Sequence, residues 1–369
     1  SHQITRQWRE YERTNTAVLS AYVQPTADRY LTNLNASLSE RGFDGSLYIM
    51  QSNCGIDTVD STRQTPIMMV ESGPASGVWG AAEFGRLLGE QNVVALDIGG
   101  TTAKCSLVEN GHVKVITDYW IERNQESSGY PILAPVVDIV EIGNGGGSIA
   151  WVDHLGRLHV GPQSAGANPG PVSYGKGGTE PTTTDANLAL GRINPKYFCG
   201  GTVTADMDAV NSALDQLAGV LNVSRAEAAR GIVRIANHNM INALKLVSLN
   251  RGHDPRDFTL VTFGGGGGMH ANALAKELQI EQVIIPAESS VFSAWGMVMS
   301  DLRRDYFKTF LCDLDEHAPE RLQQVFGTLE TQARDEFSSE GLEAKQLNYV
   351  RFARFRYRNQ EHSTEVLIP

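Results

Sequence analysis

The chain has 369 residues, of which 41% are hydrophobic and 20% charged, and a net charge of −11 at pH 7. This acidic balance, with no basic cluster, argues against a general nucleic-acid-binding protein, because such proteins gather Lys and Arg against phosphates. No apolar run approaches the roughly 18 residues that a membrane-spanning helix needs. We therefore expect a globular protein with a sizeable core, and neither nucleic acid nor a membrane as its partner.

The four cysteines are widely spaced along the chain, at Cys54, Cys105, Cys199 and Cys312. No Cys-x-x-Cys pair occurs, so the sequence predicts neither a zinc site nor a disulfide framework. Reduced thiols are the rule in the cytoplasm, and we expect a cytoplasmic protein.

The first part of the chain is predicted to mix one long helix with several strands. Apolar residues recur at helical spacing over 3–41, and Gly42 is a plausible stop. Strands are then expected at 46–51, 68–74, 93–98, 103–108, 113–120, 136–142 and 149–153, with a helix at 75–89.

The second part begins with a long segment rich in Gly and Pro, 161–185, in which little regular structure is predicted. Loops of that length inside a compact domain are usually functional or disordered. A capping box from Ser224 to Glu227 opens a long helix that we expect to end near Gly252. Further helices are predicted at 186–191, 205–221, 269–278, 292–303 and 317–340, and strands at 258–263, 283–286, 347–357 and 363–368. Alternating strands and helices predict an α/β architecture.

Three predicted strands run directly into glycine-rich turns, in the segments Asp97–Lys104, Asp138–Ser148 and Phe263–His270. Glycine lets backbone N–H groups approach a phosphate without a Cβ clash, and successive amides in a turn form an anion-binding concavity. A carboxylate such as Asp97 can hold a hydrated Mg²⁺ beside that phosphate. Structural turns would show the same residues, but three such units in one chain favour nucleotide binding.

Two common nucleotide motifs are absent. No segment fits the phosphate loop that ends in Gly-Lys-Ser/Thr, and the dinucleotide motif fails at its third glycine, where Met269 stands.

Two of the glycine turns carry a resemblance to a known superfamily. Asp97-Ile-Gly-Gly-Thr-Thr102 resembles the second phosphate motif of the superfamily that joins sugar kinases, heat-shock chaperone ATPases and actin, and Phe263-Gly-Gly-Gly-Gly-Gly-Met-His270 resembles its adenosine motif. The resemblance implies an α/β fold, an actin-like (ribonuclease H-like) ATPase lobe with family-specific insertions, that uses ATP and Mg²⁺.

The same resemblance implies a set of ligand-binding residues. Asp97 is expected to be catalytic and would hold Mg²⁺, through water. His270 would either stack near adenine or simply pack. The phosphates are assigned to Gly99, Gly100, Thr101 and Thr102, the nucleoside to Gly264, Gly265, Gly266 and Gly267, and further nucleotide contacts to Gly145 and Gly146.

A closer resemblance covers nearly the whole span from Tyr11 to Thr309. It is to the hydantoinase A/oxoprolinase family, whose N-methylhydantoinase A-like members share ordered blocks with this chain. The blocks are Met50–Asn53, Glu71–Gly77, Asp138–Ile139, Ile142–Ala150, Gly161–Ala167, Pro169–Pro171, Thr184–Asn187 and Phe292–Gly296.

The family resemblance implies ATP-dependent opening of a cyclic amide of the hydantoin or 5-oxoproline type. A hydantoinase B-type partner, as a subunit or a fused domain, would complete the hydrolysis, and we expect an oligomer. The same family also supplies the ATP-using subunit of acetone/acetophenone-type carboxylases, which is the first alternative. A nucleotide-dependent regulatory module without turnover is the second.

Three further side chains are singled out, each with an alternative. Asp138 is expected to be catalytic, although relatives often carry His where this chain has Val140. Asp185 is expected to be catalytic or to cap a helix. Lys104 would reach either a phosphate or a neighbouring carboxylate.

Family members usually carry an upstream Asp-x-Gly-Gly-Thr block as the first phosphate motif, and this chain begins well after the place where that block should lie. We therefore expect 1–310 to be the second lobe of the ATPase core and 311–369 to be the start of a truncated C-terminal α/β region. Because half of the phosphate clamp would be missing, we expect the 369-residue chain to be weakly active or inactive alone.

Overall fold

The computed structural model describes residues 4–123, 127–201, 203–341, 347–360 and 362–369. Its centre is a mixed sheet in the order β10 (Val140–Ile142), β4 (Ala103–Glu109), β3 (Val93–Ile98), β13 (Thr259–Phe263) and β14 (Val283–Ile284), with β5 (His112–Val113) paired to β4. Among the strands of this sheet, β3 comes first in the chain, and it lies in the middle of the sheet. On one side β4 is antiparallel to β3, and β10 is antiparallel to β4 and so runs in the direction of β3. On the other side β13 and then β14 follow in parallel.

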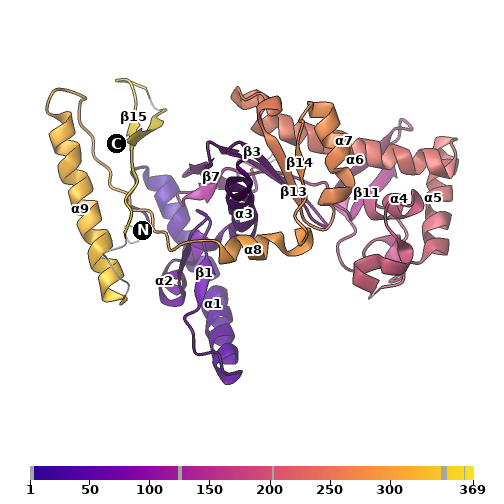
Figure 1. Cartoon of the computed structure of the whole chain (residues 1–369), viewed down its shortest axis with the longest axis horizontal. Coiled ribbons are helices and arrows are strands. Elements are labelled where there is room, and N and C mark those ends of the chain that lie inside the picture. The colour runs from indigo at the N-terminus through magenta and orange to yellow at the C-terminus, as the bar shows by residue number, and fades with distance from the viewer. Residues whose placement is uncertain (1–3, 124–126, 202, 342–346, 361) are drawn as a thin grey trace.

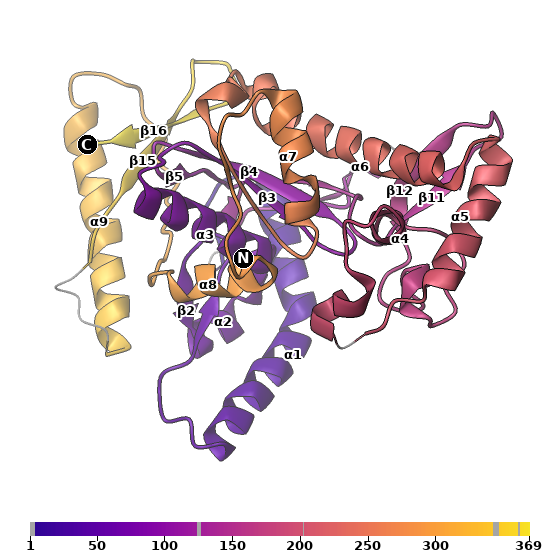
Figure 2. The same cartoon turned by 45° about the vertical axis from the view of Figure 1, so that its right-hand side comes forward.

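Helices cover both faces of this sheet, as Figures 1 and 2 show. Val93 and Ala95 of β3 pack toward α3 (Ser72–Leu88) and α8 (Phe292–Val298). Val94, Leu96 and Ile98 point the other way, toward α6 (Arg225–Val247) and α7 (Gly267–Leu278). This strict alternation follows from the two-residue period of a strand, and it places Asp97 on the α3 face.

A helical and β-hairpin unit is inserted between β10 and α6. It consists of β11 (Ser148–Val152), β12 (Leu158–Ser164), α4 (Thr183–Ala189) and α5 (Met207–Leu221) and lies beside α6 in both views. Within this unit, 3₁₀ turns lie at Val172–Tyr174 and Pro195–Gly201. Two more, at Leu249–Arg251 and Pro255–Asp257, lead from α6 to β13.

The remaining elements lie at the opposite end of the molecule (Figure 1). The helix α1 (Glu10–Glu40) donates from Asn15 Nδ2 to the carbonyl of Pro131 over 2.9 Å, which ties it to the adjoining strands. The others are β1 (Tyr48–Met50), β2 (Ile56–Thr58), α2 (Val59–Gln64), β6 (Val115–Ile116), β7 (Tyr119–Ile121), β8 (Tyr130–Ile132), β9 (Val136–Val137), α9 (Ala318–Ser339), β15 (Arg351–Phe355) and β16 (Thr364–Ile368), with a 3₁₀ turn at Pro66–Met69. A further 3₁₀ turn, Ser289–Val291, lies beside the end of β13, where Gly264 donates to the carbonyl of Ser289 over 2.9 Å.

The predicted α/β class is confirmed, and several predicted elements are corrected. The strand expected at 68–74 is wrong, because Pro66 opens a 3₁₀ turn and Glu71 adopts a left-handed backbone (φ 55°) before α3. The helix expected at 292–303 ends at Val298, because the chain after it is drawn into a bridge between Ile56 and Leu302. The helix expected from residue 3 begins at Glu10.

The strands predicted at 113–120 and 136–142 are each broken. Val113 pairs with Val108 of the main sheet, whereas Val115 pairs with Val137 in a separate two-stranded sheet. Both segments change partners beside Asp138, a switch that strand periodicity does not reveal. The strand β12 was not predicted, because Gly161 and Pro162 interrupt its pattern.

Cys54 and Cys105 are buried free thiols and Cys312 is an exposed one. The cytoplasmic location stays a prediction. Within the described ranges, no helix is both long and apolar enough to cross a bilayer.

Candidate functional site

The tip of the β3–β4 hairpin is the point where the glycine-rich loops meet. Gly146 donates to the carbonyl of Gly99 over 3.0 Å and Gly147 to that of Gly100 over 2.6 Å. From the other side, Gly266 donates to the carbonyl of Ile98 over 2.9 Å. Because β13 runs parallel to β3, the two strands end at the same edge of the sheet and bring their loops together.

Glycine is required at these contacts. A Cβ on Gly145 would lie 2.7 Å from the carbonyl oxygen of Gly99, and one on Gly264 would lie 2.3 Å from Oδ1 of Asp97. Gly264 also has a φ of +78°, which side chains rarely adopt. The glycines therefore allow three backbone segments to pack against one another.

Five backbone N–H groups at this junction have no acceptor within the described parts of the chain. They belong to Gly100, Thr101 and Thr102 at the hairpin tip and to Gly265 and Gly268 at the start of α7. All but Thr102 are in exposed residues. Unpaired amides on adjacent turns, beside a helix N-terminus, form a favourable environment for an anion such as phosphate.

Asp97 lies at the base of this junction and is mostly buried. No described donor lies within hydrogen-bonding distance of its carboxylate. Burial raises the pKa of Asp97, and the nearby positive charge of Lys104 partly opposes that effect. A buried carboxylate without a protein partner can accept a ligand's donor or a hydrated cation.

Lys104 reaches neighbouring carboxylates, which is one of the two alternatives expected for it. It is paired with Asp97 across β3–β4 and with Glu141 across β4–β10, so the three share one face of the sheet. Its Nζ lies 2.8 Å from Glu71 and 3.4 Å from Glu141. Burial lowers the pKa of Lys104, but the hydrogen bond and charge of Glu71, with Glu141, more than offset this and raise it.

Glu71 and Tyr119 complete this cluster and were not predicted as site residues. The Tyr119 hydroxyl donates to Glu71 over 3.1 Å, and burial together with the charge of Glu71 raises the pKa of Tyr119. The block Glu71–Gly77 drew attention to this segment, but the left-handed backbone that turns Glu71 toward Lys104 leaves no sequence signal.

Asp185 lies away from the solvent, and protein donors reach both of its carboxylate oxygens. Its carboxylate accepts from the backbone N–H of Val172 (3.1 Å), Ser173 (2.8 Å) and Thr182 (2.8 Å) and from the Thr182 hydroxyl (2.8 Å). It is 0% exposed. The helix cap is Thr182, with Asp185 as its capping-box partner rather than the cap itself. Through these contacts Asp185 anchors the long loop 161–185.

The loop 161–185 also contacts the junction. Thr184 donates from its backbone N–H to the carbonyl of Gly146 over 2.8 Å. Asp185 therefore helps position the loop that contacts the hairpin tip, although its own carboxylate is enclosed.

Asp138 lies farther along the sheet, near the far end of β4. Arg251 Nη2 donates to it over 2.9 Å, Nη1 donates to its other oxygen, and Lys114 Nζ lies 3.5 Å away. Ser106 donates to its backbone carbonyl over 2.8 Å. Its surroundings are those of an ion pair that holds the partner switch between β9 and β10, and a catalytic role stays a prediction.

His270 packs between α7 and α6. It is 2% exposed, and its Nδ1 lies 2.6 Å from Oδ1 of Asn237. Burial, assisted by the charge of Arg192, lowers its pKa to about 4. Of the two alternatives, these contacts favour the packed, neutral histidine.

The structure therefore brings Asp97, Gly99–Thr102, Gly145–Gly147 and Gly264–Gly267 to one junction, with Lys104 beside it. Asp138 and the side chains of Asp185 and His270 are engaged elsewhere.

Solved structures of two ATP-dependent enzymes are similar to this fold. The crystal structure of ATP-dependent caprolactamase from Pseudomonas jessenii matches with a TM-score of 0.85 and 35% identity, over 100% of this chain and 53% of that chain. A nucleotide-free structure of acetone carboxylase matches with a TM-score of 0.78 and 28% identity, over 98% of this chain and 51% of that one.

Curated relatives agree with these structures. An uncharacterized protein of Methanocaldococcus jannaschii is 41% identical over 100% of this chain and 54% of its own length. The caprolactamase subunit alpha of Pseudomonas jessenii is 37% identical over 91% of this chain and 48% of its own length. The acetophenone carboxylase gamma subunit of Aromatoleum aromaticum is 34% identical, over 95% and 48%. The chain thus spans about half the length of the curated relatives it matches.

The sequence model described as Hydantoinase/oxoprolinase matches residues 13–306. That match covers most of the chain and includes every loop of the junction, and the chain belongs to the hydantoinase/oxoprolinase family.

Proposed function

We propose that this chain provides the nucleotide-binding part of an ATP-dependent enzyme that activates a cyclic amide, of the hydantoin or 5-oxoproline type, for ring opening. One observation carries the proposal: in the described part of the chain, five backbone amides without protein acceptors lie on the glycine loops next to Asp97, a half-buried carboxylate without a protein donor. This is an environment for a phosphate chain and its cation.

The strand arrangement supports the finer fold that we propose, an actin-like ATPase lobe. The strand β3 is central, and the strands β10, β13 and β14 run parallel to it whereas β4 alone is antiparallel. A large unit is inserted after β10. We also propose 1–310 as that lobe and 311–369 as the start of a further region.

The residues present fit magnesium held by one carboxylate and phosphate oxygens. Asp97 is the only carboxylate we assign to it, and no described group of three or more His, Cys, Asp or Glu residues forms a full metal cage. Mg²⁺ commonly binds through one or two carboxylates together with substrate phosphates and water. When bound, it would neutralise phosphate charge.

The chemistry explains why ATP is needed. An unactivated amide carbonyl is a poor electrophile, and moving a phosphoryl group to its oxygen turns that oxygen into a leaving group. The protein's contribution to such a transfer is positioning and charge neutralisation. The free amides of Gly100–Thr102 would orient the phosphates, and Gly265 and Gly268 would present theirs from the start of α7.

A carboxylase subunit is the second candidate. The acetophenone carboxylase gamma subunit is 34% identical to this chain, which is close to the 37% identity of the caprolactamase subunit alpha. Such an enzyme would activate bicarbonate or an enolate. Under either candidate we propose a partner subunit or fused domain, of the hydantoinase B type for ring opening, and an oligomer.

Calorimetric titration of MgATP and measurement of phosphate release would test the proposal. We expect MgATP to bind, Asp97→Asn to weaken that binding, and Asp118→Asn, at an exposed aspartate, to leave it unchanged. Phosphate release stimulated by hydantoin or 5-oxoproline would support ring opening, and stimulation by acetone with bicarbonate would support the carboxylase. Binding without any stimulation, with the partner present, would favour a regulatory module and overturn both.

A further inference from the structure

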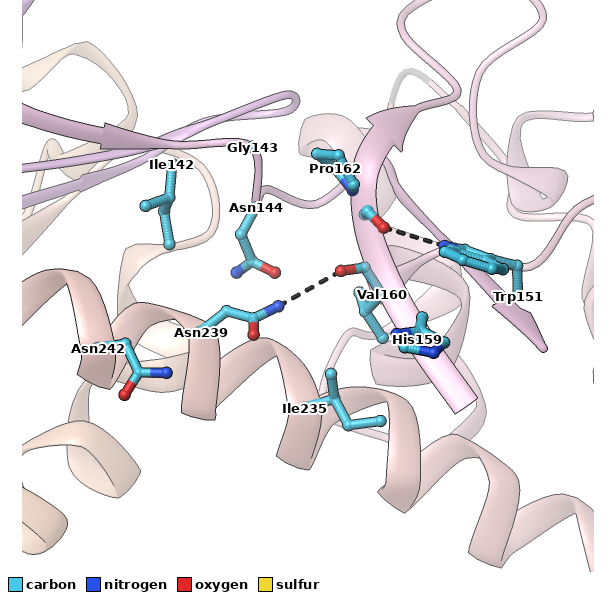
Figure 3. A pocket seen from close by; sticks show the side chains of 11 residues that line it. Ile142, Gly143, Asn144, Trp151, His159, Val160, Pro162, Ile235, Asn239 and Asn242 are labelled. Atoms are coloured by element: carbon cyan, nitrogen blue, oxygen red, sulfur yellow. Dashed lines mark hydrogen bonds between the residues drawn. The ribbon is translucent and has the colours of Figure 1, made fainter. Parts of the chain in front are cut away.

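A cavity of about 420 Å³ lies beside the junction, between the end of β10, the β11–β12 hairpin and α6 (Figure 3). Its volume is in the range of small-molecule sites. The lining is Ile142, Gly143, Asn144, Trp151, His159, Val160, Gly161, Pro162, Ile235, Asn239 and Asn242. We call it the asparagine pocket. No Asp, Glu, Lys or Arg lines it, and the one titratable lining residue, His159, is already engaged with Asp153 over 2.9 Å, so the pocket favours an uncharged ligand.

Three asparagine carboxamides supply its polar groups. The carboxamide of Asn144 is hydrogen-bonded on one side only: its Nδ2 donates to the carbonyl of Ala236 over 3.2 Å, while its buried Oδ1 has no partner. Asn239 donates to the carbonyl of Val160 over 3.3 Å, and Figure 3 shows its side chain beside Asn144. Asn242, one helical turn further on, makes no side-chain hydrogen bond with any described residue.

The walls of the pocket are apolar and, on one side, flat. Ile142, Val160 and Ile235 face it. At its rim the rings of Trp151 and His159 stack with centroids 4.6 Å apart, and the Trp151 indole donates to the carbonyl of Gly161 over 3.0 Å. These contacts hold the indole in one orientation.

We propose that the asparagine pocket binds a small, flat, neutral molecule whose ring edge carries an N–H donor next to an acceptor. A carboxamide offers the complementary pair, a C=O beside an N–H, which is how asparagine recognises an adenine edge. A cyclic amide and a nucleobase both have this edge. The unpaired oxygen of Asn144 and the free carboxamide of Asn242 are the groups that it would pair with.

The pocket shares a loop with the junction. Asn144 stands in the pocket wall, and two and three residues later Gly146 and Gly147 donate to the hairpin tip. A molecule in the pocket would therefore lie on the other side of a short loop from the proposed phosphate site. If the occupant is a cyclic amide, the inference names a site for the substrate class, and in that form it rests on the proposed function.

The test is ¹⁵N-detected NMR of the Trp151 indole N–H, assigned with Trp151→Phe, during titration of 2-pyrrolidinone and, separately, adenosine without metal or ATP. We expect a saturable shift of this signal with one of the two probes, which also decides between a cyclic amide and a nucleobase. Asn242→Ala should weaken binding about tenfold, and Ile235→Trp should abolish it by filling the pocket. Asn35→Ala, an exposed asparagine on α1, is the matched control.

No saturable shift with either probe would overturn the inference, as would unchanged affinity in both Asn242→Ala and Ile235→Trp. Because Asn242 is exposed, its variant is expected to fold even if Ile235→Trp does not. Lactam binding without stimulated phosphate release would leave the pocket standing and count against the proposed function. If a cyclic amide stimulates phosphate release and neither Asn242→Ala nor Ile235→Trp changes that stimulation, the proposed function is supported and the pocket is not the substrate site.

Discussion

Asp97 and Asp185 are both aspartates that the sequence marks as catalytic, and their surroundings are opposite. Asp185 is fully enclosed and accepts from four protein donors, whereas Asp97 is partly exposed and accepts from no described donor. The carboxylate of Asp185 is closed to a ligand, because it is fully buried and protein donors reach both of its oxygens. The carboxylate of Asp97 keeps both oxygens free of described protein donors. The difference separates a residue that builds the site from one that can act in it.

The largest effect that would test this comparison is on stability, at Asp185. Asp185→Ala leaves three buried backbone N–H groups without their acceptor. We expect the free energy of unfolding to fall by about 3–5 kcal/mol, because each orphaned donor carries a desolvation cost. Urea denaturation followed by circular dichroism measures it.

Asp185→Asn provides the milder variant if the alanine protein does not fold. It keeps one acceptor oxygen and places an amide against the remaining donors, so we expect a smaller loss. If the free energy of unfolding falls by less than about 1 kcal/mol in both variants, Asp185 does not anchor the loop 161–185.

The second effect concerns His270, which shares the enclosed character of Asp185. Burial lowers its pKa to about 4 from the ordinary 6.5, so the unfolded chain binds the proton more readily than the folded one. The stability due to neutral His270 is therefore complete above pH 6.5 and is lost as the pH falls toward 4. We expect a loss of up to about 3 kcal/mol over that window.

Urea denaturation at pH 7.5 and at pH 5 would show this loss, and His270→Gln should reduce the pH dependence. His112→Gln, at an exposed histidine, is the control and should leave the dependence unchanged. If the two variants behave alike, His270 is accessible to solvent and the adenine-stacking alternative regains support.

A third effect contrasts two glycines of the same loop. Gly264→Ala would place a methyl group 2.3 Å from Oδ1 of Asp97 at a φ of +78°, whereas Gly265→Ala meets nothing within 4 Å. We expect Gly264→Ala to lower the free energy of unfolding by about 1–3 kcal/mol. Gly265→Ala should be nearly neutral for folding, as measured by thermal unfolding. Equal effects would show that the loop relaxes freely and does not hold Asp97.

These contrasts also show how far the sequence could be interpreted. The α/β class, the β3–β4 hairpin and the meeting of glycine loops were predictable, because strand periodicity and glycine clustering are local signals. The partner switch at Asp138 and the left-handed turn at Glu71 were not, since both depend on tertiary contacts. Nor could a pattern of residues reveal that protein donors reach both carboxylate oxygens of Asp185 while no described donor reaches Asp97.

The smallest expected change in stability is at Asp97, and its sign is the informative part. Burial raises the pKa of Asp97, so the folded chain disfavours its ionised form at neutral pH. Asp97→Asn removes that charge, and we expect the protein to become slightly more stable near pH 7. The gain should vanish as the pH falls through the raised pKa toward the ordinary value of 3.8, where wild-type Asp97 is protonated as well.

The same Asp97→Asn protein should bind MgATP at least about tenfold more weakly, so stability and ligand affinity move in opposite directions. Asp118→Asn should change neither. A stability loss with unchanged MgATP affinity would place Asp97 with Asp185 among the residues that only build the fold. Opposite movement is the behaviour expected of a carboxylate kept without protein partners for a ligand, because the fold tolerates its charge and the ligand compensates it.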